Sequence, residues 1–239
     1  MKKQVIFVAD DFGMNAEINK AILHANLYGG LHGAALMMTQ PGTDEAVALA
    51  RENPGLQIGW HLHLNDSQPA TLARWPWGNS PARAGIAIST SRKAQAIMRG
   101  EMERQWELFR QTGLPCHFVN CHHHLHAHPL ILRTMMEVLG PDFSGWIRLG
   151  RVRFFPPGFR LFDSSRVIDA CFSHHRKLST WRSPDTLWGI DRLFAMNSGE
   201  VRAAMATLPD GFHEFIFHPR TLSCPDTQCL LDLQPFQNR

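Results

Sequence analysis

Histidine is concentrated in this chain at a density that points to metal or proton chemistry. The sequence holds 14 His among 239 residues, and five of them fall within seven positions, at His122, His123, His124, His126 and His128. Neutral imidazole is the commonest metal ligand among side chains, and it titrates near physiological pH. The tract is therefore a candidate metal or proton-transfer site.

Two further polar clusters follow or interrupt apolar segments. Asp10 and Asp11 come directly after the apolar run 5–9, and two adjacent carboxylates are costly to desolvate unless a cation or a proton compensates them. His61 and His63 alternate with apolar residues, so on a strand both imidazoles would face the same side. An isolated Asp pair is more often one helix cap and one solvated carboxylate, but the combination with two histidine clusters favours a metal site.

A mixed set of Asp and His ligands without thiolates indicates a catalytic divalent metal. Such a set suits Zn²⁺, Mn²⁺, Fe²⁺, Co²⁺ or Ni²⁺ better than Mg²⁺ or Ca²⁺, which prefer oxygen ligands. With three protein ligands, the metal keeps open positions at which it polarises a carbonyl and lowers the pKa of a bound water. A free carboxylate nearby can take the proton of that water. We expect one divalent ion, with Zn, Mg, Mn, Co and Ni all left open as its identity, and chemistry that hydrolyses an amide or an ester.

The elements that must position these residues are strands alternating with helices. Apolar runs of strand length lie at 4–9, 34–38, 57–64, 117–124, 146–149 and 215–217, and amphipathic segments lie at about 15–28, 43–52, 92–112 and 129–139. The stretch 65–91, rich in Pro, Gly, Ser and Trp, predicts an elaborated loop, and residues 150–195 show no clear pattern. Strands joined by helical crossovers pair in parallel and are covered on both faces.

We therefore predict an α/β fold, a distorted (β/α) barrel of the TIM-barrel type, forming a single domain over residues 1–239. An open doubly wound sheet is the alternative. The barrel is favoured because the polar residues follow predicted strands, and β/α barrels assemble their active sites at the carboxyl ends of strands. These residues are Asp10, Asp11, His61, His63, Asn120 to His124, Arg148 and His218.

Composition excludes several classes of protein. An apolar fraction of 44% and a charged fraction of 19% predict a globular chain, and a formal charge of +3 gives no broad footprint for nucleic acid. The sequence has no apolar run of the ~18 to 20 residues that a membrane span needs and no signal-peptide core, so a cytoplasmic location is expected. The five cysteines form no Cys-x-x-Cys motif and are expected to be reduced.

Four motifs carry the polar clusters in a fixed order along the chain. They are Val8-Ala9-Asp10-Asp11-Phe12-Gly13, Gly59-Trp60-His61-Leu62, the tract from His117 to His126, and Phe217-His218-Pro219. In order and spacing they resemble the YdjC-like carbohydrate deacetylases, over roughly residues 4 to 220. Within that family, the segment from Val119 to Pro129 is most similar to the branch associated with hopanoid biosynthesis. The resemblance implies a distorted β/α barrel and metal-dependent removal of N-acetyl groups from amino sugars.

The resemblance also implies roles for individual residues. Asp11, His61 and His122 match the metal ligands of the family. Asp10 matches the carboxylate that activates water, and His218 matches the general acid that protonates the leaving amine.

Four more residues are expected to contact the substrate or to support the ligands: Arg148, Asn120, His124 and His126. Arg148 resembles an arginine that would orient Asp10 or bind substrate, with an exposed strand-end charge as its alternative. Asn120 stands where the wider family commonly has Asp, and as a neutral group it can still orient a ligand histidine. The other histidines of both clusters are expected to pack or to support, because three protein ligands suffice.

The expected substrate is an N-acetylated amino sugar, and the branch resemblance suggests an N-acetylglucosaminyl hopanoid. The aromatic and Pro-rich segment 154–162 is explained either as barrel-rim packing or as a peripheral contact with the inner face of the membrane, where basic residues beside aromatic ones bind anionic lipid. The sequence leaves this choice and the oligomeric state open.

Three alternatives remain beside this reading. One is a deacetylase of soluble chitooligosaccharides. Another is a different barrel amidohydrolase, although such enzymes usually carry His-x-His on the first strand, where this chain has Asp10 and Asp11. The third is a non-catalytic metal-binding module built on His122 to His128, which would bind several ions per chain and would not need Asp10, His61 and His218 at strand ends.

Overall fold

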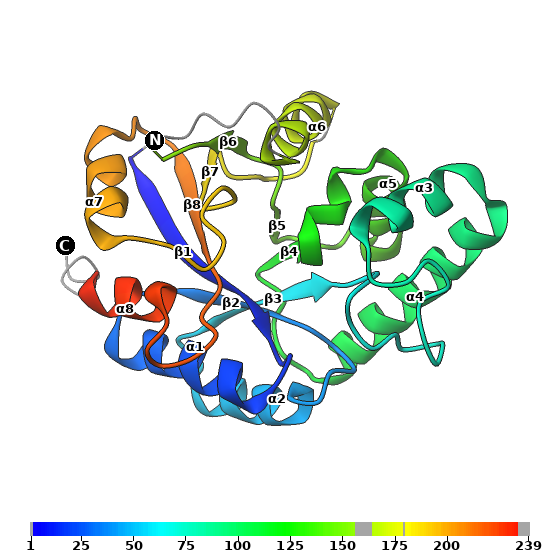
Figure 1. Ribbon diagram of the computed structural model, residues 1–239, viewed down its shortest axis with the longest axis horizontal. Helices are drawn as coiled ribbons and strands as arrows, with labels where there is room; N and C mark the ends of the chain where they lie inside the picture. The colour runs from blue at the N-terminus through cyan, green and yellow to red at the C-terminus, as the bar shows by residue number, and fades with distance from the viewer. Residues whose placement is uncertain (1, 156–163, 179, 234–239) are drawn as a thin grey trace.

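Eight parallel strands form one curled sheet at the centre of the molecule (Figure 1). The structure, a computed structural model, describes residues 2–155, 164–178 and 180–233. The strands follow the order β5-β4-β3-β2-β1-β8-β7-β6, and within the described residues the sheet stays open between β5 and β6. The predicted α/β fold, a distorted barrel, is confirmed.

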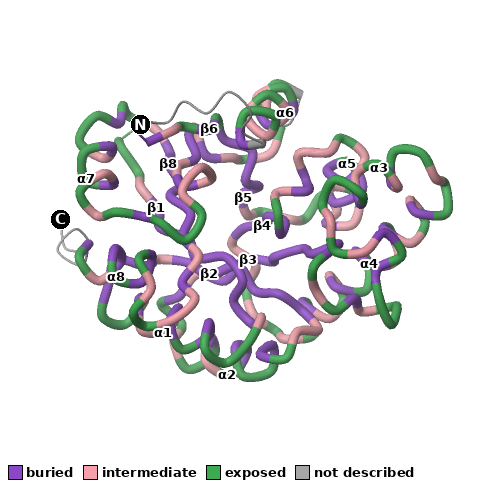
Figure 2. Tube along the Cα trace, viewed as in Figure 1, coloured by how far each residue is buried: buried purple, intermediate pink, exposed green. Residues whose placement is uncertain are grey.

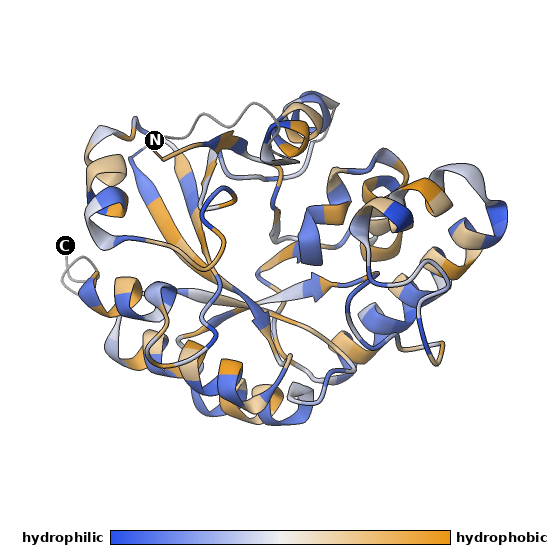
Figure 3. Ribbon diagram, in the orientation of Figure 1, coloured by the Kyte–Doolittle hydropathy of each residue, from blue (hydrophilic) through white to orange (hydrophobic). Residues whose placement is uncertain are grey.

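The strands line the inside of the curl and the helices lie outside it. The strands are β1 (Gln4–Phe12), β2 (Gly33–Leu36), β3 (Gln57–Leu62), β4 (Phe118–Cys121), β5 (Trp146–Ile147), β6 (Arg151–Arg153), β7 (Thr186–Trp188) and β8 (Phe212–Phe217). The helices are α1 (Ala16–Tyr28), α2 (Thr43–Glu52), α3 (Pro81–Thr90), α4 (Arg92–Gln111), α5 (Pro129–Leu139), α6 (Ser164–Leu178), α7 (Ser198–Thr207) and α8 (Pro225–Asp232), with a 3-10 helix, η1 (His122–Ala127), after β4. Figure 2 shows the strands buried and the outer helix faces exposed, and Figure 3 shows apolar residues along the strands.

Local signals in the sequence fix the starts of several helices. The Asn15 side chain accepts a hydrogen bond from the Ile18 N–H and caps α1, as predicted. Pro129 starts α5 at its first turn, where a missing N–H costs nothing. The predicted loop 65–91 is wrong in its last third, because Ser80 caps α3 and Pro81 begins it. Ser and Pro count as loop residues in that stretch, although Ser followed by Pro is also a usual helix start.

Side chains inside the curl form an apolar layer with a polar layer beyond it. Phe118 stacks on Trp146 with ring centroids 4.8 Å apart, and Trp146 meets Phe212 edge-on at 5.4 Å. Because alternate residues of a strand face the same side, the positions two residues further along also point inward. In this layer they are Asp10, Asn120, Arg148 and Glu214, all buried.

The strand β1 breaks this alternation at its carboxyl end. Its register with β2 shifts between Ala9 and Phe12, and Asp11 has a φ of 68°. A residue other than glycine in this left-handed region is strained, and such strain persists where the surroundings over-determine it. The bulge lets two consecutive carboxylates, Asp10 and Asp11, both lie buried at the end of one strand.

The strands near the histidines are shorter than predicted. The strand β3 ends at Leu62, so the expected alternation of His61 and His63 along a strand does not hold. The predicted strand 117–124 is cut at Cys121, where the chain turns into η1 with positive φ values at His123 and His124. Residues 150–195, which had no clear pattern, contain β6, α6 and β7.

Phe155, one residue of the segment 154–162 for which rim packing and membrane contact are both considered, belongs to the core. Its side chain is buried and lies against Trp188, with ring centroids 5.2 Å apart, so it forms part of the core and not of an exposed surface. Residues 156–163 lie outside the described residues. Among the helices that are described, none has the length and apolarity needed to cross a membrane.

The interior aromatic layer yields a test of packing. A Cβ added at Gly59 on β3 would stand 2.4 Å from the Phe118 ring, which Trp146 holds from behind. We expect Gly59→Ala to lower the free energy of unfolding by about 1–3 kcal/mol, as overpacking does. The matched control is Gly100→Ala in α4, where an added Cβ meets no atom within 4 Å. That change should raise stability by about 0.5–1 kcal/mol through helix propensity. Urea unfolding of both variants measures the difference, and equal effects would contradict the packing account.

Candidate active site

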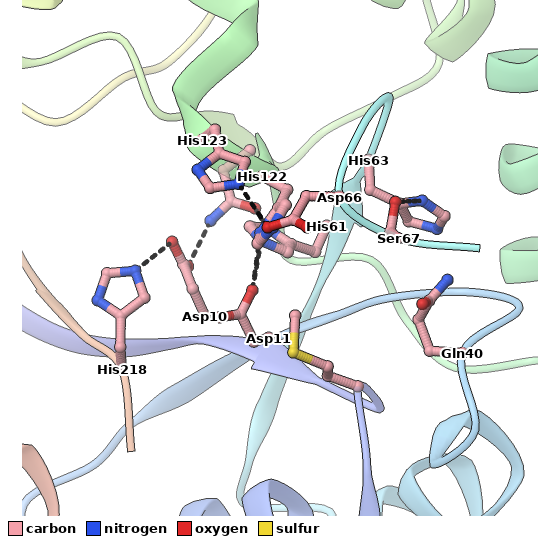
Figure 4. A network of polar contacts seen from close by, with 12 residues as sticks. Asp10, Asp11, Gln40, His61, His63, Asp66, Ser67, His122, His123 and His218 are labelled. Atoms are coloured by element: carbon pink, nitrogen blue, oxygen red, sulfur yellow. Dashed lines mark hydrogen bonds and ion pairs between the residues drawn. The ribbon is translucent and has the colours of Figure 1, made fainter. Parts of the chain in front are cut away.

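Three of the predicted residues meet at the carboxyl ends of β1, β3 and β4 (Figure 4). Asp11, His61 and His122 are buried, and one ligand atom from each lies within 4.8 Å of the others. The Asp11 Oδ1 atom is 3.3 Å from His61 Nε2 and 2.9 Å from His122 Nδ1. Neither oxygen of Asp11 has a hydrogen-bond partner, and Oδ2 has an ion-pair contact with Arg220 Nη2 at 3.2 Å. A carboxylate buried between two imidazole nitrogens has lost its hydration, so a positive charge between these atoms would stabilise it.

The proton positions around His61 follow from its neighbours. Asn120 Nδ2 donates to Asp10 Oδ1 at 2.9 Å, so the amide oxygen of Asn120 is the atom that faces His61 Nδ1 at 2.5 Å. The amide oxygen can only accept, so His61 Nδ1 carries the proton and the other ring nitrogen, Nε2, keeps its lone pair. That lone pair is buried without a partner and faces Asp11 Oδ1.

These unpartnered atoms fit a divalent metal. A lone pair facing a carboxylate is repulsive unless a cation lies between them, and one carboxylate with two imidazoles is a usual set for Zn²⁺ and related ions. His122 Nε2 is also buried without a partner. Asn120 orients His61 as expected of a residue that supports a metal ligand.

The guanidinium of Arg148, in the buried polar layer, holds the Asp10 carboxylate through two hydrogen bonds. Arg148 donates from Nη1 to Asp10 Oδ2 at 2.6 Å and from Nη2 to Asp10 Oδ1 at 2.9 Å. The same guanidinium contacts Glu214 Oε1 at 2.7–2.8 Å. Arg148 has no exposed surface, so the alternative of a strand-end charge in solvent is wrong. Its two hydrogen bonds to Asp10 match the expected role of an arginine that orients this carboxylate.

The charges in this cluster shift its pKa values. Burial, the largest single effect, would raise the pKa of Asp10, but the charge and hydrogen bonds of Arg148 together with His61 and His218 outweigh burial and hold the pKa below its usual range. Burial also opposes ionisation of Asp11, whose pKa is held well below its usual range by His122 and His61. The pKa of His61 is raised, because Asp10 and Asp11 outweigh its burial. Both carboxylates are therefore ionised at neutral pH.

His218 follows β8 and lies beside Asp10, on the side away from Asp11 (Figure 4). Its Nε2 atom is 3.8 Å from Asp10 Oδ2, and its Nδ1 atom is buried without a partner. Burial lowers the pKa of His218, although Asp10 and Asp11 act in the opposite direction. The backbone N–H of His218 donates to Asp226 Oδ2 at 2.7 Å, which fixes the end of the strand.

The remaining histidines support the site from outside the cluster. His126 Nε2 lies 2.8 Å from the backbone oxygen of Arg148, and burial lowers its pKa to about 3. His63 packs between the Met38 carbonyl and Ser67, away from the three candidate ligands. His124 lies beside His126, with ring centroids 6.4 Å apart. A more exposed group joins His123 to Asp66 and His122.

Three charged residues of the site escaped sequence analysis: Glu214, Arg220 and Asp226. Glu214 interrupts the apolar strand Phe212–Phe217, and a charged residue inside a buried strand was a usable signal. Arg220 Nη2 lies 3.2 Å from Asp11 Oδ2, two residues beyond the recognised His218. Asp226 lies in the first turn of α8 and looked like an ordinary helix-start carboxylate.

Fold and site together define the class of protein. The chain is an open α/β barrel with a buried Asp-His-His cluster at the carboxyl ends of its strands, and an Asp-Arg pair beside that cluster. It belongs to the YdjC-like protein family, which matches residues 4–233.

Relatives with known names share part of the chain. It is 34% identical over 137 residues to a carbohydrate deacetylase of Brevibacillus brevis and 32% identical over 137 residues to one of Vibrio campbellii. Each match covers 56% of this chain and 55% of the relative. The chain thus spans about half the length of the curated relatives it matches.

Two solved structures resemble the fold. A proposed cellobiose-phosphate cleavage protein of Enterococcus faecalis superposes with a TM-score of 0.70 at 18% identity, covering 97% of this chain and 91% of that one. The lactam utilization protein of Thermus thermophilus superposes with a TM-score of 0.52 at 14% identity, covering 96% and 95%. At these identities the likeness concerns the fold alone.

The buried position of Arg148 yields a stability test. Arg148→Met would leave Asp10 and Glu214 as buried carboxylates without a counter-charge, and we expect a loss of about 3–5 kcal/mol in unfolding free energy. In the variant the folded-state pKa values of both carboxyls should rise above their unfolded values. Its stability should therefore fall further as pH rises from 5 to 8.

Arg99→Met, which breaks exposed pairs with Glu103 and Glu137, is the control and should cost less than about 1 kcal/mol. Equal losses in the two variants would refute the account.

Proposed function

We propose that this chain hydrolyses the N-acetyl group of an amino sugar, using one divalent metal ion held by Asp11, His61 and His122. The observation that carries the proposal is the unpartnered His61 Nε2 lone pair facing Asp11 Oδ1, an oxygen that accepts no hydrogen bond. The carbohydrate deacetylases among its relatives support the choice of substrate class.

The ligand set decides what chemistry the site supplies. A divalent cation bound there would polarise the acetamide carbonyl and lower the pKa of a water molecule. The chain's own residues must then accept a proton from that water, protonate the departing amine and hold the sugar.

Asp10 is the proposed proton acceptor, and its contacts indicate which oxygen serves. Oδ1 already accepts from Asn120 and Arg148, whereas Oδ2 accepts only from Arg148 and faces His218. A carboxylate oxygen can accept two hydrogen bonds, so Oδ2 keeps the free capacity. Because Arg148 keeps Asp10 ionised, the acceptor is ready throughout the neutral pH range.

His218 is the proposed proton donor to the amine. An amine leaves poorly as an anion, so a proton must reach the nitrogen as the C–N bond breaks. His218 lies beside Asp10 Oδ2 but contributes no atom to the Asp-His-His cluster, which leaves its ring free to meet the leaving group.

An N-acetylglucosaminyl hopanoid is the finer substrate we propose to test first. Its support is the similarity of the segment from Val119 to Pro129 to the hopanoid-associated branch of the family. Contact with lipid cannot use Phe155, which is buried, so the aglycone would need a different surface. Comparing that glycolipid with diacetylchitobiose as substrates distinguishes a lipid-linked sugar from a soluble one.

The metal assignment is tested by counting ions. We expect wild-type protein to bind one Zn²⁺ per chain and His122→Ala to bind none, measured by titration calorimetry and elemental analysis. His128→Ala is the control, because His128 contacts Ser89 and lies outside the cluster. It should keep one ion. Several ions per chain, lost on changing either histidine, would favour a His-rich storage module instead.

The role of Asp10 separates metal binding from turnover. Asp10→Asn should keep the metal and lose about 10²-fold or more in kcat, the usual share of general base catalysis. Acetate release and metal content are measured on the same sample. If Asp10→Asn empties the site while Asp11→Asn does not, the roles of the two carboxylates must be exchanged.

The role of His218 is tested with two leaving groups. His218→Ala should slow hydrolysis of the acetamide far more than hydrolysis of an activated acetate ester, whose leaving group needs no proton. Equal slowing of both substrates would point to positioning or carbonyl polarisation and away from proton donation.

A further inference from the structure

Phe194 is an exposed aromatic residue in a strained backbone conformation. It lies between β7 and α7 with 38% of its surface exposed, and its φ is 60°. A bulky residue in the left-handed region is an outlier that costs on the order of 1–3 kcal/mol. Glycine or asparagine would occupy the position at lower cost, so stability does not explain a phenylalanine there.

The segment that carries Phe194 is tied to the site by one buried carboxylate. Asp226 accepts from the Met196 N–H at 3.0 Å through Oδ1 and from the His218 N–H at 2.7 Å through Oδ2. One side chain therefore holds the backbone of the Phe194 segment close to the backbone of His218.

The ring of Phe194 lies against two residues of the site. It meets the His218 ring edge-on, with centroids 5.7 Å apart and planes at 81°. The guanidinium of Arg220 lies over the Phe194 ring at 4.6 Å and also reaches Asp11 Oδ2 at 3.2 Å. The ring thus lies next to the proposed proton donor and next to the arginine that contacts the proposed metal ligand Asp11, and part of its surface is exposed.

We propose that Phe194 is a binding platform on which the pyranose ring of the substrate stacks. A pyranose carries C–H groups on its faces and hydroxyls around its edge, so a flat aromatic surface buries the faces and leaves the hydroxyls in water. A sugar seated there would lie beside His218, where the acetamide nitrogen needs a proton. The inference rests on the proposed function for its choice of ligand, and it adds the residue that selects a sugar over other acetylated compounds.

The test separates sugar recognition from chemistry. Zinc-loaded wild-type protein, Phe194→Gly, Phe194→Asn and Phe194→Tyr are each assayed with diacetylchitobiose and with trifluoroethyl acetate, an activated ester that lacks a sugar. Binding of methyl N-acetyl-β-glucosaminide is titrated separately. Gly and Asn remove the ring yet suit a positive φ, so these variants should fold at least as stably as wild type.

We expect Phe194→Gly and Phe194→Asn to raise KM and Kd for the sugars about tenfold and to leave ester hydrolysis within twofold. Phe194→Tyr, which keeps the ring, should retain wild-type values. Leu193→Ala is the matched control, because Leu193 is the exposed neighbour, 54% accessible, and should change nothing. Equal losses on ester and sugar, or unchanged sugar binding in the ring-deleted variants, would overturn the platform.

Acetate release tests the proposed deacetylase activity, whereas glycoside binding tests the role of Phe194, so the two proposals can fail separately. If wild-type protein binds the glycoside but releases no acetate, the deacetylase proposal fails, and the Kd ratios alone decide the role of Phe194. If wild-type protein does not bind the glycoside, the platform is overturned.

Discussion

One buried cation holds together the interior of this barrel. Arg148 follows β5, at one end of the sheet, and its guanidinium reaches Asp10 on β1 and Glu214 on β8, near the centre of the strand order. The ion pairs therefore cross the inside of the curl. Two carboxylates could not lie there without a counter-charge, because nothing would offset the free energy of hydration that each loses on burial. The geometry of the candidate site and the shape of the barrel depend on the same side chain.

A second constraint acts on neighbouring residues of β1. Strand geometry sends consecutive side chains to opposite faces, which would direct one of Asp10 and Asp11 away from the site. The left-handed conformation of Asp11 breaks that rule. Asp10 can then join Arg148 while Asp11 joins the two imidazoles, and each carboxylate has its own surroundings. Two chemically identical groups thereby acquire different proposed roles, one toward a proton and one toward a metal.

Much of the fold could be predicted, because the long helices and strands have strong periodic patterns. The helix from Pro129 to Leu139 was placed at both ends. The histidine tract was predicted as a strand because the tract follows an apolar run, whereas it turns into η1 through two positive φ values that no propensity indicates. The Asp-His-His cluster could be anticipated from residue types and family resemblance. Arg220 and Asp226 could not, because their importance lies in contacts between residues distant in sequence. Glu214 left only one signal, a charged residue inside an apolar strand, and its partner Arg148 follows a different strand.

The pairing of the first and last long strands bears on how the protein is made. Six residues of β1 pair in register with β8, more than 200 positions later in the chain. A chain emerging from the ribosome forms the pair of β1 and β2 well before β8 is made, because β1 and its second neighbour pair at positions more than 200 residues apart. Such distant pairings form slowly, and until then an apolar strand keeps an open edge that other chains could join. Glu214 lies on β8 and His218 directly follows it, so the residues of the candidate site come together only once β8 has paired. The proposed metal ligands Asp11, His61 and His122 all precede β8 in the chain, so the proposed metal would stabilise a nascent chain before the proposed proton donor His218 is made.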